Sequence, residues 1–132
     1  MAKALDIYAK FATNKDEELR SGAKFVIDDE TDTYIMVKRC FSRNRNLTKA
    51  QAELAKQLGE RDDEEAEYQR SALLVRHLVV DWNNIGDTNG DPIPFSIEKA
   101  IEVLTDLPDL LDKLVAFAID GDNYRLDKIA KN

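Results

Sequence analysis

The segment VVDWNNIGDTNGDPIPFS, residues 79–96, is the part of the chain that most restricts the possible folds. It contains two of the five glycines, two of the three prolines and the single tryptophan. Glycine and asparagine favour the positive φ values of tight turns, and proline cannot continue a helix or a central strand. The segment therefore predicts a connector built from a pair of turns, with helical regions on either side.

The composition of this connector is also similar to that of a calcium loop. Such a loop needs oxygen ligands at its first, third and fifth positions, a glycine at the sixth and a glutamate at the twelfth. When Gly90 takes the sixth position, the two end positions fall on Ile85 and Ser96. When Gly86 takes it, the last position falls on Pro92. Neither register completes a coordination shell, so we expect no calcium and no other metal here.

The length of 132 residues is typical of one domain with a single hydrophobic core. The apolar and charged fractions, 43% and 34%, are those of a globular protein.

The longest apolar run, residues 114–119, is far too short to span a bilayer. The first ten residues interleave charges with apolar side chains, unlike a signal peptide. A lone Cys40 and a single histidine leave no disulfide and no zinc cluster. We therefore expect a cytoplasmic protein without cofactors.

The net charge of −7 is unevenly divided along the chain. Residues 1–60 carry eleven basic and ten acidic side chains, whereas residues 61–132 carry eight and sixteen. The acidic second half argues against general nucleic-acid binding, because it would repel the phosphate backbone.

One basic cluster, KRCFSRNRNLTK at residues 38–49, contains no acid. Its arginines Arg39, Arg43 and Arg45 could bind RNA or an acidic protein surface. The alternative is a solvated loop, which we favour because a single aromatic residue, Phe41, is interleaved with the charges.

Two runs of β-branched and aromatic residues, AKFVID and TYIMVKRCF, flank a short acidic turn and predict a β-hairpin over about residues 22–42. A lone hairpin is marginally stable in water, so it must pack on a helix or pair with another chain. This makes a homo-oligomer possible. The preceding run ALDIYAKFA predicts a short N-terminal helix or docking arm.

Helical signals fill most of residues 48–120. Thr48 and Gln51 form a capping box for a first helix that ends or kinks at Gly59. A second helix is expected from the acidic run at residue 61 as far as the tryptophan. His77 lies on its apolar stripe and is expected to be a packed core or boundary residue rather than a catalytic one.

Two further helices are expected after the connector. Ser96 is the predicted N-cap of the first, and Pro108 is placed in the first turn of the second. Gly121 is the expected left-handed terminator, and Tyr124, Leu126 and Ile129 are possible anchors of the tail beyond it.

Together these signals predict a single α+β domain over residues 1–132, in which an N-terminal β-hairpin packs on a mainly α-helical bundle and a short tail covers residues 122–132. The sequence has no phosphate loop, nucleophile elbow or Walker motif. Its acids cluster at helix starts and on polar faces, where the helix dipole and solvation explain them. We therefore expect a binding protein and not an enzyme.

Several short motifs follow the hairpin in a fixed order between about residues 20 and 125. They are the arginine–asparagine loop at 43–46, Trp82, the connector D-x-x-G-x-P-x-P-F-S at 87–96, P-x-L at 108–110, and the aromatic Tyr124 after a polar turn. In this order and spacing the chain resembles the tail assembly chaperones of long-tailed bacteriophages. One departure is DWNN, where that family commonly has a glycine before the tryptophan.

The resemblance implies a non-enzymatic morphogenesis factor in the host cytoplasm that is absent from the mature virion. Such chaperones bind the tape-measure protein, keep it soluble and help to recruit tail-tube subunits. In this context the connector is expected to be a rigid corner pinned by Trp82, Ile93 and Phe95, although these apolar residues could instead face a partner. The competing class is a small phage-encoded nucleic-acid-binding or regulatory protein that uses residues 38–49.

Many chaperones of that family are made in two lengths through a −1 ribosomal slip. Residues 130–132, AKN, could be encoded by a string that contains the slippery heptamer A-AAA-AAC, or by other codons. If the slip occurs, residues 1–132 are the shared domain and the extension would recruit tube subunits. Residues 125–132 are then expected to be a mobile lead-out and not part of the core.

Overall fold

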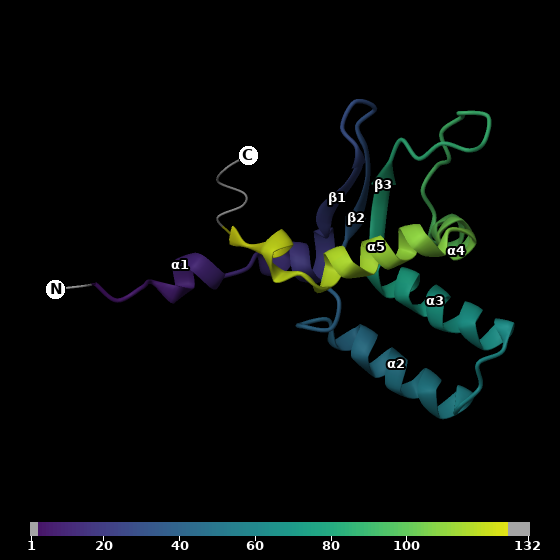
Figure 1. The fold of residues 1–132 in the computed structure, drawn as a ribbon, viewed down its shortest axis with the longest axis horizontal. Helices are drawn as coiled ribbons and strands as arrows, with labels where there is room; N and C mark the ends of the chain where they lie inside the picture. The colour runs from purple at the N-terminus through teal and green to yellow at the C-terminus, as the bar shows by residue number, and fades with distance from the viewer. Residues whose placement is uncertain (1–2, 127–132) are drawn as a thin grey trace.

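The computed structural model describes residues 3–126. Three strands and five α-helices make up most of it, which confirms the predicted α+β class (Figure 1). In chain order the elements are α1 (Ile7–Phe11), the π-helical turn η1 (Glu17–Ser21), β1 (Ala23–Asp28), β2 (Thr33–Val37), α2 (Arg45–Leu58), α3 (Glu64–Leu78), β3 (Val79–Asn83), α4 (Ile97–Asp106), α5 (Pro108–Ile119) and the 3-10 turn η2 (Gly121–Tyr124). Within the described part of the chain, no helix combines the length and the apolar character needed to cross a membrane.

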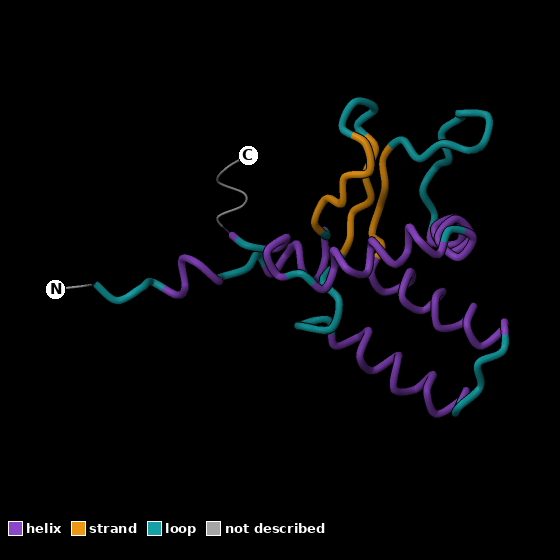
Figure 2. The backbone as a smooth tube through the Cα atoms, viewed as in Figure 1, coloured by secondary structure: helices purple, strands orange, loops and turns teal. Residues whose placement is uncertain are grey.

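The sheet is antiparallel, with the order β1-β2-β3 (Figure 2). Phe25, Ile35 and Trp82 are paired across the three strands, and their side chains face the helices. Because side chains alternate between the two faces of a sheet, the neighbouring row of Lys24 and Met36 lies on the opposite face. One face is therefore core and the other is open, as is common for antiparallel sheets.

The third strand corrects the predicted secondary structure. The helix expected to continue to Trp82 ends at Leu78, and Val79 begins β3 without an intervening loop. The adjacent β-branched residues Val79 and Val80 favour a strand, and β3 pairs with β2. The predicted two-stranded hairpin is thus two strands of a three-stranded sheet.

Capping residues set the helix boundaries. The helix expected from Thr48 begins earlier, at Arg45, because the Asn44 side chain accepts a hydrogen bond from the Leu47 amide at 3.2 Å. The predicted N-cap at Ser96 is confirmed, and Pro108 is the first residue of α5 as expected. The predicted left-handed Gly121 is wrong, because α5 ends through Asp120 in an extended conformation.

The tail is packed as far as the structure describes it. Tyr124 is wholly buried and its hydroxyl donates to the Val37 carbonyl at 2.9 Å, which confirms it as an anchor. The Leu126 amide donates to the Ala12 carbonyl at 3.0 Å, so residues 125 and 126 pair with the N-terminal segment rather than leading away from the fold. Residues 127–132, including the possible slip site at 130–132, lie outside the described residues.

Residues 3–12, which we name the N-terminal arm, extend away from the rest of the fold (Figure 1). The Asp6 side chain caps α1 by accepting hydrogen bonds from the Tyr8 and Ala9 amides, both at 3.1 Å. No residue of α1 is buried. This agrees with the predicted short N-terminal helix.

Candidate partner-binding site

The candidate arginines of the basic cluster are partly neutralised from inside the fold by Glu18. The Glu18 side chain is 0% exposed and lies on η1. Its carboxylate pairs with Arg39 Nη1 at 2.5 Å and with Arg43 Nε at 3.0 Å. The Thr13 hydroxyl donates to Glu18 Oε1 at 2.8 Å. Arg39 and Arg43 are therefore structural ion-pair partners, and the single carboxylate of Glu18 offsets one of their two positive charges.

The asparagine of the same loop has a structural role as well. The Asn44 side chain is buried, and besides capping α2 it donates to the Arg39 carbonyl at 2.9 Å and to the His77 carbonyl at 3.3 Å. It thus fixes the start of α2 against the end of α3. Of the three candidate arginines, Arg45 is the one that lies exposed without an ion pair to Glu18.

The three apolar candidate residues of the connector, Trp82, Ile93 and Phe95, contact one another through Trp82 and form the predicted corner. Trp82 Nε1 donates to the Ile93 carbonyl at 2.8 Å, and the Phe95 ring meets the indole edge-on with centroids 5.4 Å apart. The Ile93 amide in turn donates to the Ile85 carbonyl at 2.7 Å. Trp82 is 7% exposed and belongs to the main core, whereas Ile93 and Phe95 are half-buried against it. Trp82 therefore offers little surface to a partner.

The polar part of the connector is held by its own aspartate. The Asp87 carboxylate accepts hydrogen bonds from the Asn89 amide at 2.8 Å and the Asp91 amide at 3.0 Å. Gly90 has the positive φ, 82°, that this turn requires. Among residues 3–126, no group of three or more His, Cys, Asp or Glu side chains is arranged to hold a metal ion.

Two side chains with shifted pKa values, Cys40 and His77, lie near the ends of β2 and α3. Burial raises the pKa of the Cys40 thiol to about 11, so the thiolate is disfavoured at neutral pH. Burial, followed by the nearby charges of Lys38 and Arg76, lowers the pKa of His77, which is half-buried. His77 is therefore neutral at physiological pH and occupies the boundary position expected for it.

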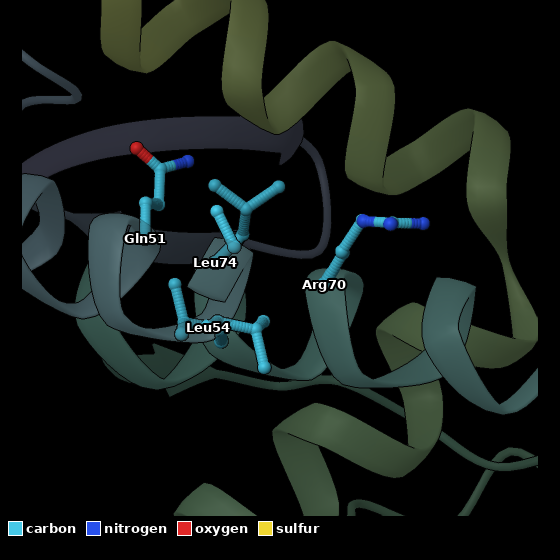
Figure 3. A pocket seen from close by; sticks show the side chains of 6 residues that line it. Gln51, Leu54, Arg70 and Leu74 are labelled. Atoms are coloured by element: carbon cyan, nitrogen blue, oxygen red, sulfur yellow. The ribbon is translucent and has the colours of Figure 1, made fainter. Parts of the chain in front are cut away.

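A groove between α2 and α3 is the clearest open apolar feature of the helical part (Figure 3). It has a volume of about 340 Å³. Six side chains line it: Gln51, Leu54 and Ala55 from α2, and Arg70, Leu73 and Leu74 from α3. The lining is apolar at its centre, with the amide of Gln51 and the guanidinium of Arg70 at its edges.

A second hollow lies on the same helix pair, beside the groove. It has a volume of about 190 Å³ and shares Leu54 and Leu73 with the groove. Leu54 and Leu73 therefore stand between two open spaces. Both hollows are open to solvent, so these two leucines are accessible from outside the helix pair.

The groove was not identified from the sequence, although one signal for it is present. Leu73, Leu74 and Val75 are consecutive, so the apolar surface of α3 extends around more than one side of the helix. Val75 faces the core, and Leu73 and Leu74 line the groove. A helix with two apolar sides has to pack on both, here on α4 and on α2.

Comparison with known proteins gives one family. A model of the YdaY prophage protein family matches residues 35–132, from the central strand to the end of the chain. No curated protein matches the chain. No solved structure matches it either. The matched segment includes the arginine–asparagine loop, both groove helices and the connector, and it covers well over half of the sequence. The chain is therefore phage-derived and belongs to the YdaY prophage protein family.

Proposed function

We propose that this protein is a tail assembly chaperone that acts without catalysis in the cytoplasm of the host cell. In this role it binds helical apolar segments of the tape-measure protein and keeps them soluble until the tail tube forms around them. The phage origin of the family and the order of motifs that resembles tail assembly chaperones both support this proposal.

The observation that carries the proposal is the groove between α2 and α3. An amphipathic helix binds such a groove by inserting apolar side chains spaced three and four residues apart. Leu54, Leu73 and Leu74 supply apolar contacts, and the groove is open to solvent along one side. A long helical protein with repeated apolar stripes offers many equivalent segments of this kind, so several chaperones could bind one tape measure.

Recruitment of tail-tube subunits is assigned to a longer form of the protein. Such a form would carry an extension beyond the packed segment around Tyr124. The shared domain would then bind the tape measure, and the extension would bind the tube protein. The mature virion would contain neither form.

The competing nucleic-acid function depends on the basic cluster, residues 38–49. The ion pairs of Arg39 and Arg43 with Glu18 reduce the charge that this cluster can offer to phosphate groups. A salt titration separates the two functions, because phosphate contacts weaken steeply with salt and an apolar groove contact does not.

The groove variant Ala55→Glu tests the proposed function. Ala55 is exposed, so the substitution should change the free energy of unfolding by no more than about 0.5 kcal/mol. A carboxylate inside the apolar groove should weaken binding to tape-measure fragments from the same prophage by about tenfold or more. Calorimetric titration of each fragment measures the dissociation constant.

Ala52→Glu is the matched control, since Ala52 is also exposed on α2 but does not line the groove. It should bind the fragments as the unchanged protein does. Equal binding by both variants would place the tape-measure site elsewhere. If no fragment binds the unchanged protein, the proposal is wrong.

A further inference from the structure

The N-terminal arm exposes more apolar surface than a stable terminal helix would. Leu5, Ile7, Tyr8 and Phe11 are between 54% and 79% exposed. Ile7, Tyr8 and Phe11 line a hollow of about 530 Å³ together with Lys15 and Arg43. Exposed apolar clusters of this kind mark interaction sites. A helix of five residues is also too short to be stable in water without a partner.

The base of the arm is fixed, which sets the direction of the arm. Thr13 pairs with Arg125 as an antiparallel bridge, and the Asn14 amide donates to the Tyr124 carbonyl at 2.7 Å. The Arg125 guanidinium lies over the Phe11 ring, 5.2 Å from its centroid. From this anchored base the arm points away from α2 and α3 of its own chain (Figure 1). The arm is therefore placed to meet another molecule.

The charges of the arm and of the groove region are opposite. The arm, residues 3–12, contains two lysines and one aspartate, a balance of +1. Residues 59–67, which form the turn after α2 and the first turn of α3, contain six acids and one arginine, a balance of −5. Arg70 of the groove donates to the carbonyl of Arg61, so the groove ends beside this acidic turn. An arm that enters the groove would bring its lysines close to those acids.

From these observations we infer that the N-terminal arm of one copy docks into the α2–α3 groove of a second copy. Ile7, Tyr8 and Phe11 would lie against Leu54, Leu73 and Leu74. The two surfaces belong to different parts of the molecule, so the contact is head-to-tail. Such contacts produce rings or open chains rather than closed dimers.

A displacement step follows if the proposed function is correct, and this step alone rests on it. The arm and a tape-measure helix would compete for one groove. In the absence of the tape measure, the arms would cover the grooves and keep them from exposing apolar surface. A tape-measure helix would displace the arm and release the neighbouring copy.

A complementation experiment with full-length protein tests the head-to-tail contact. The arm variant Ile7→Ser/Tyr8→Ser retains its groove, and the groove variant Ala55→Glu retains its arm. Each variant alone should self-associate about tenfold or more weakly than the unchanged protein, because central apolar anchors dominate interface energies. An equimolar mixture should restore a 1:1 dimer and nothing larger. Sedimentation velocity across the micromolar range distinguishes these species.

Two control variants alter surfaces outside the contact. Val26→Ser changes an exposed apolar residue on β1 that is 44% exposed, and Ala52→Glu changes α2 away from the groove. Both should assemble as the unchanged protein does. The inference is overturned if the unchanged protein stays monomeric over this range, if the arm variant assembles normally, or if the mixture gives no dimer.

Tape-measure fragments separate failure of this inference from failure of the proposed function. With both correct, a fragment should dissociate the oligomer, and the arm variant should bind the fragment at least as tightly as the unchanged protein. Complementation without any fragment binding would retain the arm contact and reject the chaperone function. Fragment binding without complementation would support the chaperone function and overturn the arm contact.

Discussion

Replacing Trp82 by alanine should lower the free energy of unfolding by about 3–5 kcal/mol, the usual cost of truncating a buried tryptophan. The indole is 7% exposed, packs edge-on against Phe95 and donates to the Ile93 carbonyl. Its loss would leave a cavity between β3 and the connector. Since small domains have a total stability of about 5–15 kcal/mol, the variant would be marginally folded. Urea denaturation followed by circular dichroism measures the change, because the variant lacks the only tryptophan.

Trp82→Phe is the matched control for this prediction. It retains an aromatic ring beside Phe95 but removes the hydrogen bond to Ile93. The hydrogen bond contributes about 1 kcal/mol, so this variant should retain more stability than the alanine variant. An alanine variant with full stability and no affinity for the tape measure would instead assign Trp82 to a partner surface.

Replacing Glu18 by glutamine should cost a similar amount, about 3–5 kcal/mol, for an electrostatic reason. The change keeps the shape of the side chain and removes its charge. Arg39, whose side chain is only 16% exposed, would then be a buried cation without its counter-charge. The free energy of unfolding from urea denaturation gives the cost. The π-helical turn that holds Glu18 also supports the base of the N-terminal arm, so self-association should weaken in the same variant.

Asp16→Asn serves as the control, because Asp16 pairs with Arg20 at 3.5 Å on the surface. Exposed ion pairs contribute about 0–1 kcal/mol. The double variant Glu18→Gln/Arg39→Gln removes both buried charges, and we expect it to be more stable than Glu18→Gln alone. A cost for Glu18→Gln no greater than that for Asp16→Asn would show that the ion pair contributes little.

Local sequence signals predicted the elements that depend on local physics. The strands β1 and β2, the cap at Ser96 and the proline that begins α5 are all set by residues within a few positions of one another. Tyr124 and Leu126 were both expected as possible anchors of the tail, but Leu126 is 50% exposed and only Tyr124 of the two is buried. The structure confirms it with a hydrogen bond to Val37, far away in the sequence.

Features that depend on distant contacts were missed. Val79 to Trp82 continues the apolar rhythm of α3, and only pairing with β2 turns these residues into a strand. Glu18 is one of three consecutive acids, a pattern typical of a solvated surface. Its burial depends on two arginines more than twenty positions later in the chain, Arg39 and Arg43. No local pattern in the sequence indicates that Glu18 pairs with these two arginines.

Helix α3 continues directly into β3, so a change in the direction of the strand would also tilt the helix. Leu78 ends the helix, Val79 begins the strand, and the Leu78 carbonyl accepts a hydrogen bond from the Lys38 amide at 2.7 Å. With 15 residues, α3 is about 22 Å long, so a tilt of about ten degrees at the junction would move its far end by about 4 Å. Substitutions on the open face of the sheet, such as at Met36, could therefore widen or narrow the groove without touching it. The packing of the sheet would then control the width of the groove, and with it the size of the side chains that the groove can bind.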